Sequence, residues 1–183
     1  VTLVSRDVPV EAAAVLRFGH SAQKRTAIIA HLWLRAARVR EGATEPRLVR
    51  VAVINTQLES DEHGPTYRPQ QLELLSQFLR TEGVNGGVIA GDLYPVSRSD
   101  RQQPEKLGLK DAWKRGDDDE EGFTCFDKSD HPRIPPARFD KLLFLPRRGL
   151  KVDEPTRIGM DLTCDGAAVS EHCGLMSTLH MLK

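Results

Sequence analysis

The chain has 183 residues, of which 39% are hydrophobic and 28% charged, a balance typical of a globular protein with a buried core. Its 26 acidic and 26 basic residues give a formal net charge of zero, so no global charge attracts nucleic acid or an anionic membrane. Any phosphate binding must therefore come from a local patch. The length favours a single domain over residues 1–183, and no apolar run is long enough to predict a membrane span.

The three cysteines are isolated, odd in number and lack CxxC spacing: Cys125, Cys164 and Cys173. This pattern argues against a disulfide framework and against a structural zinc site. We therefore expect an intracellular protein, either nuclear or cytoplasmic.

The first half of the chain predicts strands followed by a helix. Because Val1–Val4 already reads as a strand, we expect the chain to begin inside a domain whose N-terminal part is missing. Thr26–Trp33 and Leu48–Leu58 are rich in apolar and β-branched residues and are predicted to be strands. The polar residues 38–46 between them predict an exposed hairpin loop. Leucines at three- and four-residue spacings then indicate an amphipathic helix over residues 69–83, opened by proline and closed by glycine.

The second half predicts further strands around an irregular region. Gly87–Asp92 is a short apolar run that closes on a carboxylate, as expected of a buried strand with Asp92 at its C-terminal end. Residues 100–114 are expected to be irregular with short helical pieces. Phe139–Leu145 and Cys173–Met181 are predicted to be strands. This order favours a mixed-sheet α/β sandwich over an all-parallel fold.

Four short segments with polar side chains stand at the ends of predicted strands: NTQLES at 55–60, GDLY at 91–94, RFDK at 138–141 and SEH at 170–172. Together they supply carboxylates, a histidine and an arginine. Hydrolysis of a phosphodiester needs a metal held by carboxylates, a base for the attacking water and cations that face the phosphate. The four segments are therefore candidates for such a site.

In order and spacing these segments resemble the exonuclease-endonuclease-phosphatase superfamily, most closely its tyrosyl-DNA phosphodiesterase 2-like branch with its fungal members. The family pattern is NTHLES, GDxN, DxW, RxDK or RxDR, and SDH followed by Gly-Leu. This chain has NTQLES, GDLY, Asp111-Ala-Trp113, RFDK and SEHCGL, spread over nearly all of residues 1–182. The resemblance implies a DNase I-like sandwich, of which the chain would be the C-terminal portion. It also implies a phosphodiesterase dependent on Mg²⁺ or Mn²⁺ that acts on nucleic acid or another phosphodiester, with 5′ DNA adducts as the nearest substrate.

The resemblance gives catalytic roles to three residues. Asp92 would orient or deprotonate the attacking water, His172 would contact the scissile phosphate, and Asp140 would orient that histidine. Asp92 and Glu171, which replaces the family's aspartate, would hold the metal. The family's principal metal-binding glutamate lies on a strand upstream of anything in this chain.

Five further residues would bind substrate. Arg138 would present positive charge to it, and Glu59 and Ser60 would lie beside the phosphate path. Gln57 stands where the family has histidine and so loses a group that can be cationic. Tyr94 stands where the family has the asparagine of GDxN, which polarises phosphate or water.

Each candidate also has a structural interpretation. Asp92 can be a turn residue, Arg138 and Asp140 can take part in cross-strand ion pairs, and His172 can be a hydrogen-bonded residue of a C-terminal strand. The replaced site residues and the missing upstream strands leave open a second hypothesis: a catalytically degenerate relative that acts as a binding or interaction module. Whether the parent protein is an enzyme stays open at this point.

Overall fold

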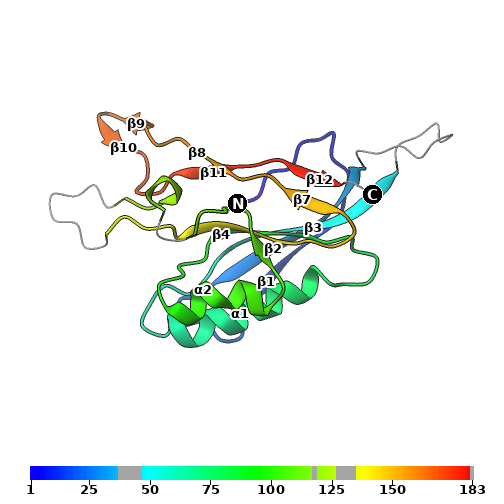
Figure 1. Ribbon diagram of the computed structural model, residues 1–183, viewed down its shortest axis with the longest axis horizontal. Helices are drawn as coiled ribbons and strands as arrows, with labels where there is room; N and C mark the ends of the chain where they lie inside the picture. The colour runs from blue at the N-terminus through cyan, green and yellow to red at the C-terminus, as the bar shows by residue number, and fades with distance from the viewer. Residues whose placement is uncertain (37–46, 117–118, 127–134, 182–183) are drawn as a thin grey trace.

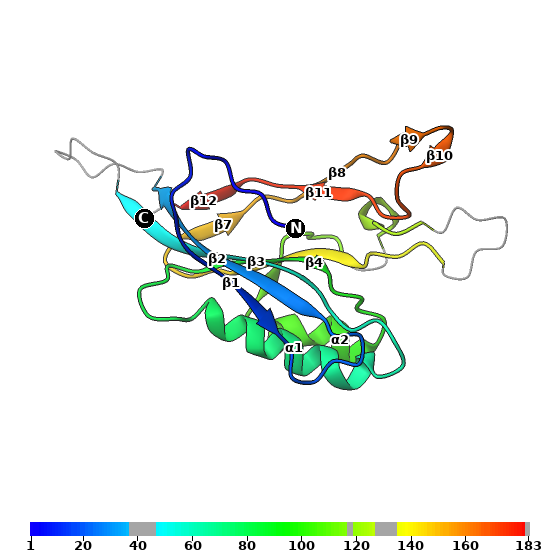
Figure 2. The same ribbon diagram turned by 180° about the vertical axis from the view of Figure 1, so that it is seen from behind.

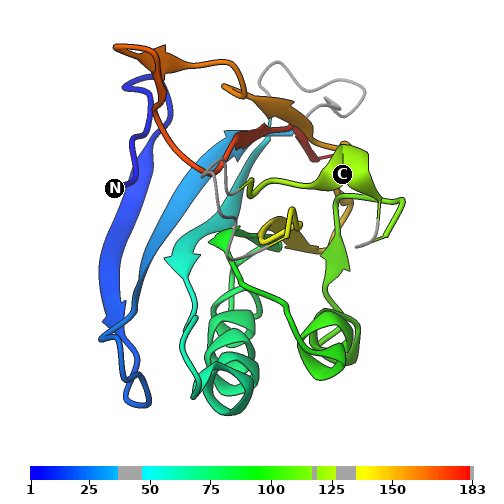
Figure 3. The ribbon, with the colours of Figure 1, turned by 90° about the vertical axis from the view of Figure 1, so that its left-hand side faces the viewer.

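The computed structural model describes residues 1–36, 47–116, 119–126 and 135–181, which form three layers (Figures 1 and 2). A six-stranded sheet lies between two helices on one face and short two-stranded ribbons on the other (Figure 3). In spatial order the sheet contains β1 (Val10–Arg17), β2 (Thr26–Arg35), β3 (Leu48–Gln57), β4 (Gly87–Asp92), β6 (Asp140–Leu145) and β5 (Lys110–Asp111).

The sheet is mixed, as the order of the predicted elements indicated. β3 and β4 are parallel, and every other neighbouring pair is antiparallel. A parallel pair needs a crossover connection, which is α1 (Gly64–Phe78). α2 (Arg98–Lys106) follows β4 on the same face, and a short 3₁₀ turn spans Glu120–Gly122.

Strand alternation separates two apolar layers. The helix-facing layer contains Ile54, Ile89 and Leu143 of the central strands together with Leu72, Leu75 and Leu79 of the α1 region. The ribbon-facing layer contains Val49, Val51, Val88 and Phe144 with Leu150, Val152 and Met181 of the ribbons. Because both faces of β3, β4 and β6 are buried, the polar residues at their ends lie at the edge of a rigid scaffold.

The ribbons are three antiparallel pairs: β7 (Leu150–Val152) with β12 (Leu179–Met181), β8 (Thr156–Ile158) with β11 (Gly174–Met176), and β9 (Thr163–Cys164) with β10 (Ala167–Ala168). The single strand predicted over Cys173–Met181 is therefore wrong, since β11 and β12 divide it. Their partners are interrupted at residues 153–155, where Pro155 has no N–H to donate to a ladder. The hydrogen bond from the Asp153 N–H to the Thr178 carbonyl (3.0 Å) bridges this break.

Other predictions differ from the structure at element boundaries. Val1–Val4 forms no strand. α1 begins at Gly64, five residues earlier than predicted, because Pro65 occupies its first turn while Pro69 lies inside the helix. The strand β1 was not predicted. The region expected to be irregular with short helical pieces contains one nine-residue helix, α2, and the short strand β5, which was not predicted. The loop predicted at 38–46 lies outside the described residues.

No helix in the described part of the chain is long and apolar enough to cross a membrane. Cys164 and Cys173 are free thiols. Cys125 and Cys173 are buried, and only Cys164 is exposed.

Candidate active site

Three strand ends bring polar side chains together at one edge of the sheet. Gln57 pairs with Asp92 across β3 and β4, and Asp92 pairs with Asp140 across β4 and β6. Alternation puts these residues on the same face as Val88 and Phe144, the face that the ribbons cover. Directly paired residues on antiparallel strands have Cβ atoms about 4.5–5.5 Å apart. The two carboxylates are therefore immediate neighbours.

His172 reaches this row from the segment before β11. Its Nδ1 lies 2.7 Å from Oδ2 of Asp140. A carboxylate can only accept hydrogen bonds, so Nδ1 donates and Nε2 is the ring atom that faces a ligand. Within the described residues no partner bonds to Nε2, and the His172 side chain is 33% exposed. The structure thus brings Asp92, Asp140 and His172 together, with Asp140 placed to orient the imidazole.

The Asp92 carboxylate is held by two donors and is half-buried. Its Oδ2 accepts a hydrogen bond from Gln57 Nε2 (3.1 Å), and its Oδ1 accepts one from the Tyr94 N–H (3.2 Å). Burial raises the pKa of Asp92, and the negative charge of Asp140 raises it further. The two hydrogen bonds and the charge of His172 act in the opposite direction without cancelling the increase. A carboxylate with a raised pKa is better suited to accept a proton from water at neutral pH.

Two residues outside the predicted set support the constellation. Gly91 has a φ of +136°, and a Cβ there would lie 1.9 Å from the Thr56 carbonyl oxygen, so this position requires glycine. The buried Oγ1 of Thr124 accepts hydrogen bonds from the N–H groups of Phe139 (3.2 Å) and Asp140 (3.0 Å). An isolated threonine carries no recognisable sequence signal. Only the fold reveals its position.

Two predicted substrate-binding residues have structural positions instead. Arg138 is buried and pairs with Asp111 (2.8 Å), which Lys141 also contacts at 3.2 Å. Glu59 is fully buried. Its carboxylate accepts hydrogen bonds from two groups of the β1–β2 turn, the Ser21 hydroxyl (2.6 Å) and the Gln23 N–H (2.8 Å). Arg138 therefore has the structural role of an ion-pair partner. Both side chains are buried and bonded within the protein, which leaves neither exposed for contact with a substrate.

The other predicted residues lie at the surface around the site. Ser60 Oγ accepts a hydrogen bond from Arg25 (2.9 Å). Tyr94 has a φ of +47°, and its ring centroid lies 4.4 Å from that of Phe139. The Glu171 side chain is exposed, and its backbone carbonyl accepts a hydrogen bond from the N–H of Phe126 (2.8 Å). The structure does not join the Glu171 carboxylate to Asp92 by any described contact.

No protein-family profile and no curated protein matches the sequence. Solved structures do match. TDP2 of D. rerio complexed with single-strand DNA product superposes with a TM-score of 0.70 at 17% identity, covering 94% of this chain and 68% of that one. Truncated TDP2 of Caenorhabditis elegans gives 0.68 at 23%, covering 97% and 68%. An endonuclease/exonuclease/phosphatase from Beutenbergia cavernae DSM 12333 gives 0.64 at 18%, covering 95% and 46%.

This chain has the endonuclease/exonuclease/phosphatase fold. The DNase I-like mixed sandwich expected from the motifs is confirmed. Identities below 25% extend the likeness to the fold and no further, so the activity has to be argued from this chain's own side chains.

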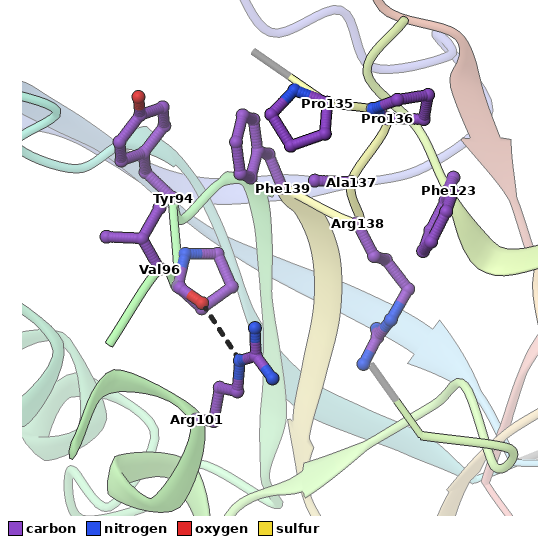
Figure 4. A pocket seen from close by; sticks show the side chains of 10 residues that line it. Tyr94, Val96, Arg101, Phe123, Pro135, Pro136, Ala137, Arg138 and Phe139 are labelled. Carbon is purple, nitrogen blue, oxygen red and sulfur yellow. Dashed lines mark hydrogen bonds between the residues drawn. The ribbon is translucent and has the colours of Figure 1, made fainter. Parts of the chain in front are cut away.

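Beside the row formed by Asp92, Asp140 and His172, this chain has an apolar pocket of about 270 Å³ (Figure 4). Tyr94 and Phe139 lie at one side of it, with the prolines Pro135 and Pro136 near them. Arg101 lies at its lower end, where Nε donates to the Pro95 carbonyl (3.5 Å). The Phe139 ring centroid is 6.4 Å from that of His172, so the pocket adjoins the candidate catalytic groups.

The donor set permits an open Mg²⁺ site rather than a closed one. Asp92 and Asp140 offer neighbouring carboxylates, and Mg²⁺ is commonly held by one or two carboxylates while waters and substrate phosphate complete its shell. The described residues contain no group of three or more His, Cys, Asp or Glu side chains arranged to enclose a metal.

Proposed function

We propose that this chain is the catalytic portion of a divalent-metal-dependent phosphodiester hydrolase that acts on nucleic acid. The observation that carries the proposal is the row Asp92, Asp140 and His172, in which Nδ1 of the histidine contacts Asp140 and no described residue bonds to Nε2. A general base, a hydrogen-bond donor to phosphate and a residue that orients that donor are the groups that such a hydrolysis requires.

In the proposed reaction Asp92 accepts a proton from the water that attacks phosphorus. In this role His172 is protonated on both ring nitrogens: Nδ1 donates to Asp140, which fixes the orientation of the ring, and Nε2 donates to a phosphate oxygen. The bond to the leaving oxygen breaks at the same time, and that oxygen takes its proton from solvent water. Bound Mg²⁺ or Mn²⁺ would supply positive charge opposite the phosphate. The sequence predicts Asp92 and Glu171 as its ligands, whereas the neighbouring carboxylates that could hold it in the structure are those of Asp92 and Asp140.

For the substrate we propose a single-stranded DNA end, with a 5′ adduct as the finer hypothesis. The support is the fold shared with TDP2 of D. rerio, which was crystallised with single-strand DNA product. The half-buried row lies at the edge of the sheet, where an extended strand can reach it.

The test is turnover of a 5′-phosphotyrosyl oligonucleotide and of a generic phosphodiester with Mg²⁺ or Mn²⁺. His172→Ala should lower kcat by about 100-fold or more. The matched control is His180→Ala, which removes a second histidine–aspartate pair, His180 Nε2 to Asp153 Oδ2 at 2.7 Å, on the ribbon β12. Chelation with EDTA should abolish turnover. Absence of turnover with either metal, or equal loss in both histidine variants, would contradict the proposal.

A second candidate function is substrate binding without hydrolysis, and Tyr94 favours it. Its backbone N–H bonds to Asp92, and its bulky ring lies against Phe139 and lines the apolar pocket (Figure 4). A degenerate relative would bind the oligonucleotide without cleaving it, and Tyr94→Ala would weaken that binding. Measurable turnover by the wild-type protein would exclude this candidate.

A further inference from the structure

The cations around the candidate active site differ in whether their charge is neutralised. Arg68 is buried against Asp100 (2.7 Å). Arg138 and Lys141 both contact Asp111 (2.8 and 3.2 Å). These three cations are engaged by carboxylates, so they offer little uncompensated charge to an incoming anion.

Arg25 is different because neutral groups hold it. Its guanidinium donates to Gln57 Oε1, to Ser60 Oγ (2.9 Å) and twice to Gln23 Oε1 (3.1 Å from Nε, 2.9 Å from Nη2). Over the residues that the structure describes, no carboxylate lies within ion-pair distance of Arg25. Its position just before β2 is thereby fixed while its charge stays uncompensated.

Gln57 connects Arg25 to the catalytic row. Its amide oxygen accepts from Arg25 while its amide nitrogen donates to Asp92 (3.1 Å), so one side chain separates the cation from the candidate base. Arg25, Lys24, Asn55 and Gln57 also line a cavity of about 310 Å³ at this strand end. This cavity is distinct from the apolar pocket at Tyr94 and is rich in hydrogen-bond donors.

We propose that Arg25, with Lys24 beside it, forms a subsite for a second phosphate of the substrate, next to the phosphate held at Asp92 and His172. The inference rests on the proposed function. Asp92 and Asp140 make the row acidic, so an anionic substrate needs a nearby uncompensated cation. A guanidinium can exchange its neutral acceptors for two phosphate oxygens in a bidentate contact. The site then selects a strand with at least two consecutive phosphates over an isolated phosphodiester.

Binding is tested first, in EDTA, with a fluorescein-labelled single-stranded oligonucleotide over about 50–200 mM salt. Arg25→Gln should weaken binding roughly tenfold and reduce the slope of log K against log salt by about 0.7, the loss of one phosphate contact on a single strand. Arg25→Lys should recover part of the affinity, because lysine keeps the positive charge but cannot make the bidentate contact of a guanidinium. The matched control is Arg35→Gln, at the exposed end of β2 that lies far from Arg25. It should leave both the affinity and the salt slope unchanged.

Kinetics then separate a subsite from a structural role. Arg25→Gln should raise KM for the oligonucleotide with little change in kcat, and should raise KM for bis(p-nitrophenyl) phosphate, which has one phosphate, much less. Equal losses on both substrates, or a salt slope equal to that of Arg35→Gln, would overturn the inference. A wild-type protein that shows Arg25-dependent binding but no turnover would support the subsite while refuting the hydrolase.

Discussion

Thr124 gives the sharpest test of how the candidate active site is positioned. Its buried hydroxyl accepts the N–H groups of Phe139 and Asp140, just where β6 begins. Thr124→Val keeps the shape but leaves both donors without this acceptor. A buried donor without a partner costs about 1–3 kcal/mol. The N–H of half-buried Asp140 can recruit water, so we expect a total loss of about 2–4 kcal/mol and a Tm lower by roughly 5–15 °C.

The measurement is thermal unfolding of Thr124→Val beside Thr56→Val. Thr56 is also a buried threonine, and its hydroxyl donates to one carbonyl, that of Thr26 (3.0 Å). The control should lose only about 1 kcal/mol. Well below both unfolding temperatures, Thr124→Val should also lower kcat on the order of tenfold or more, because it loosens Asp140 and with it His172. If the two variants unfold at the same temperature with equal kcat, Thr124 does not position the site.

Three further predictions follow from the same strand ends. Burial raises the folded-state pKa of Asp92, so its contribution to stability falls as pH rises from its ordinary pKa of about 3.9 through the raised value. Asp92→Asn should therefore abolish turnover yet raise Tm at neutral pH, and calorimetry should show that gain disappear in acid. Gly91→Ala should lose about 3 kcal/mol or more in denaturant unfolding, whereas Gly19→Ala, where a Cβ meets nothing within 4 Å, should be nearly neutral. Asparagine tolerates the φ of +47° at position 94, so Tyr94→Asn should change stability by about 1 kcal/mol or less. The same variant should increase turnover. Unchanged turnover would show that the Tyr94 ring does not obstruct the site.

The central strands could be predicted because their sequences report burial directly. Leu48–Gln57 and Gly87–Asp92 are apolar on both faces, as strands between two layers must be, and each ends on a polar residue. The neighbouring placement of Gln57 and Asp92 then follows from parallel pairing. Strand ends were thus enough to predict most of the candidate row.

The remainder depended on contacts between distant segments. Residues 173–181 pair with two strands, β7 and β8, that are separated at Pro155. The division into β11 and β12 therefore depends on a distant segment, and the local sequence of residues 173–181 does not show it. α2 did carry a local signal, the capping box formed by Ser97 and Asp100, and recognising it would have predicted the helix start. Arg25 carried none, because its proximity to Gln57 arises from the register of β2 against β3.

Agreement with a motif indicates the fold more strongly than the activity, and this chain shows why. Glu59 of NTQLES is fully buried and ties the β1–β2 turn to the strand that ends at Gln57, and Arg138 of RFDK closes an ion pair with Asp111. Such contacts stabilise the sandwich whether or not it hydrolyses anything. The hydrolase hypothesis therefore depends on the few polar atoms without a structural partner, above all Nε2 of His172, to which no described residue bonds.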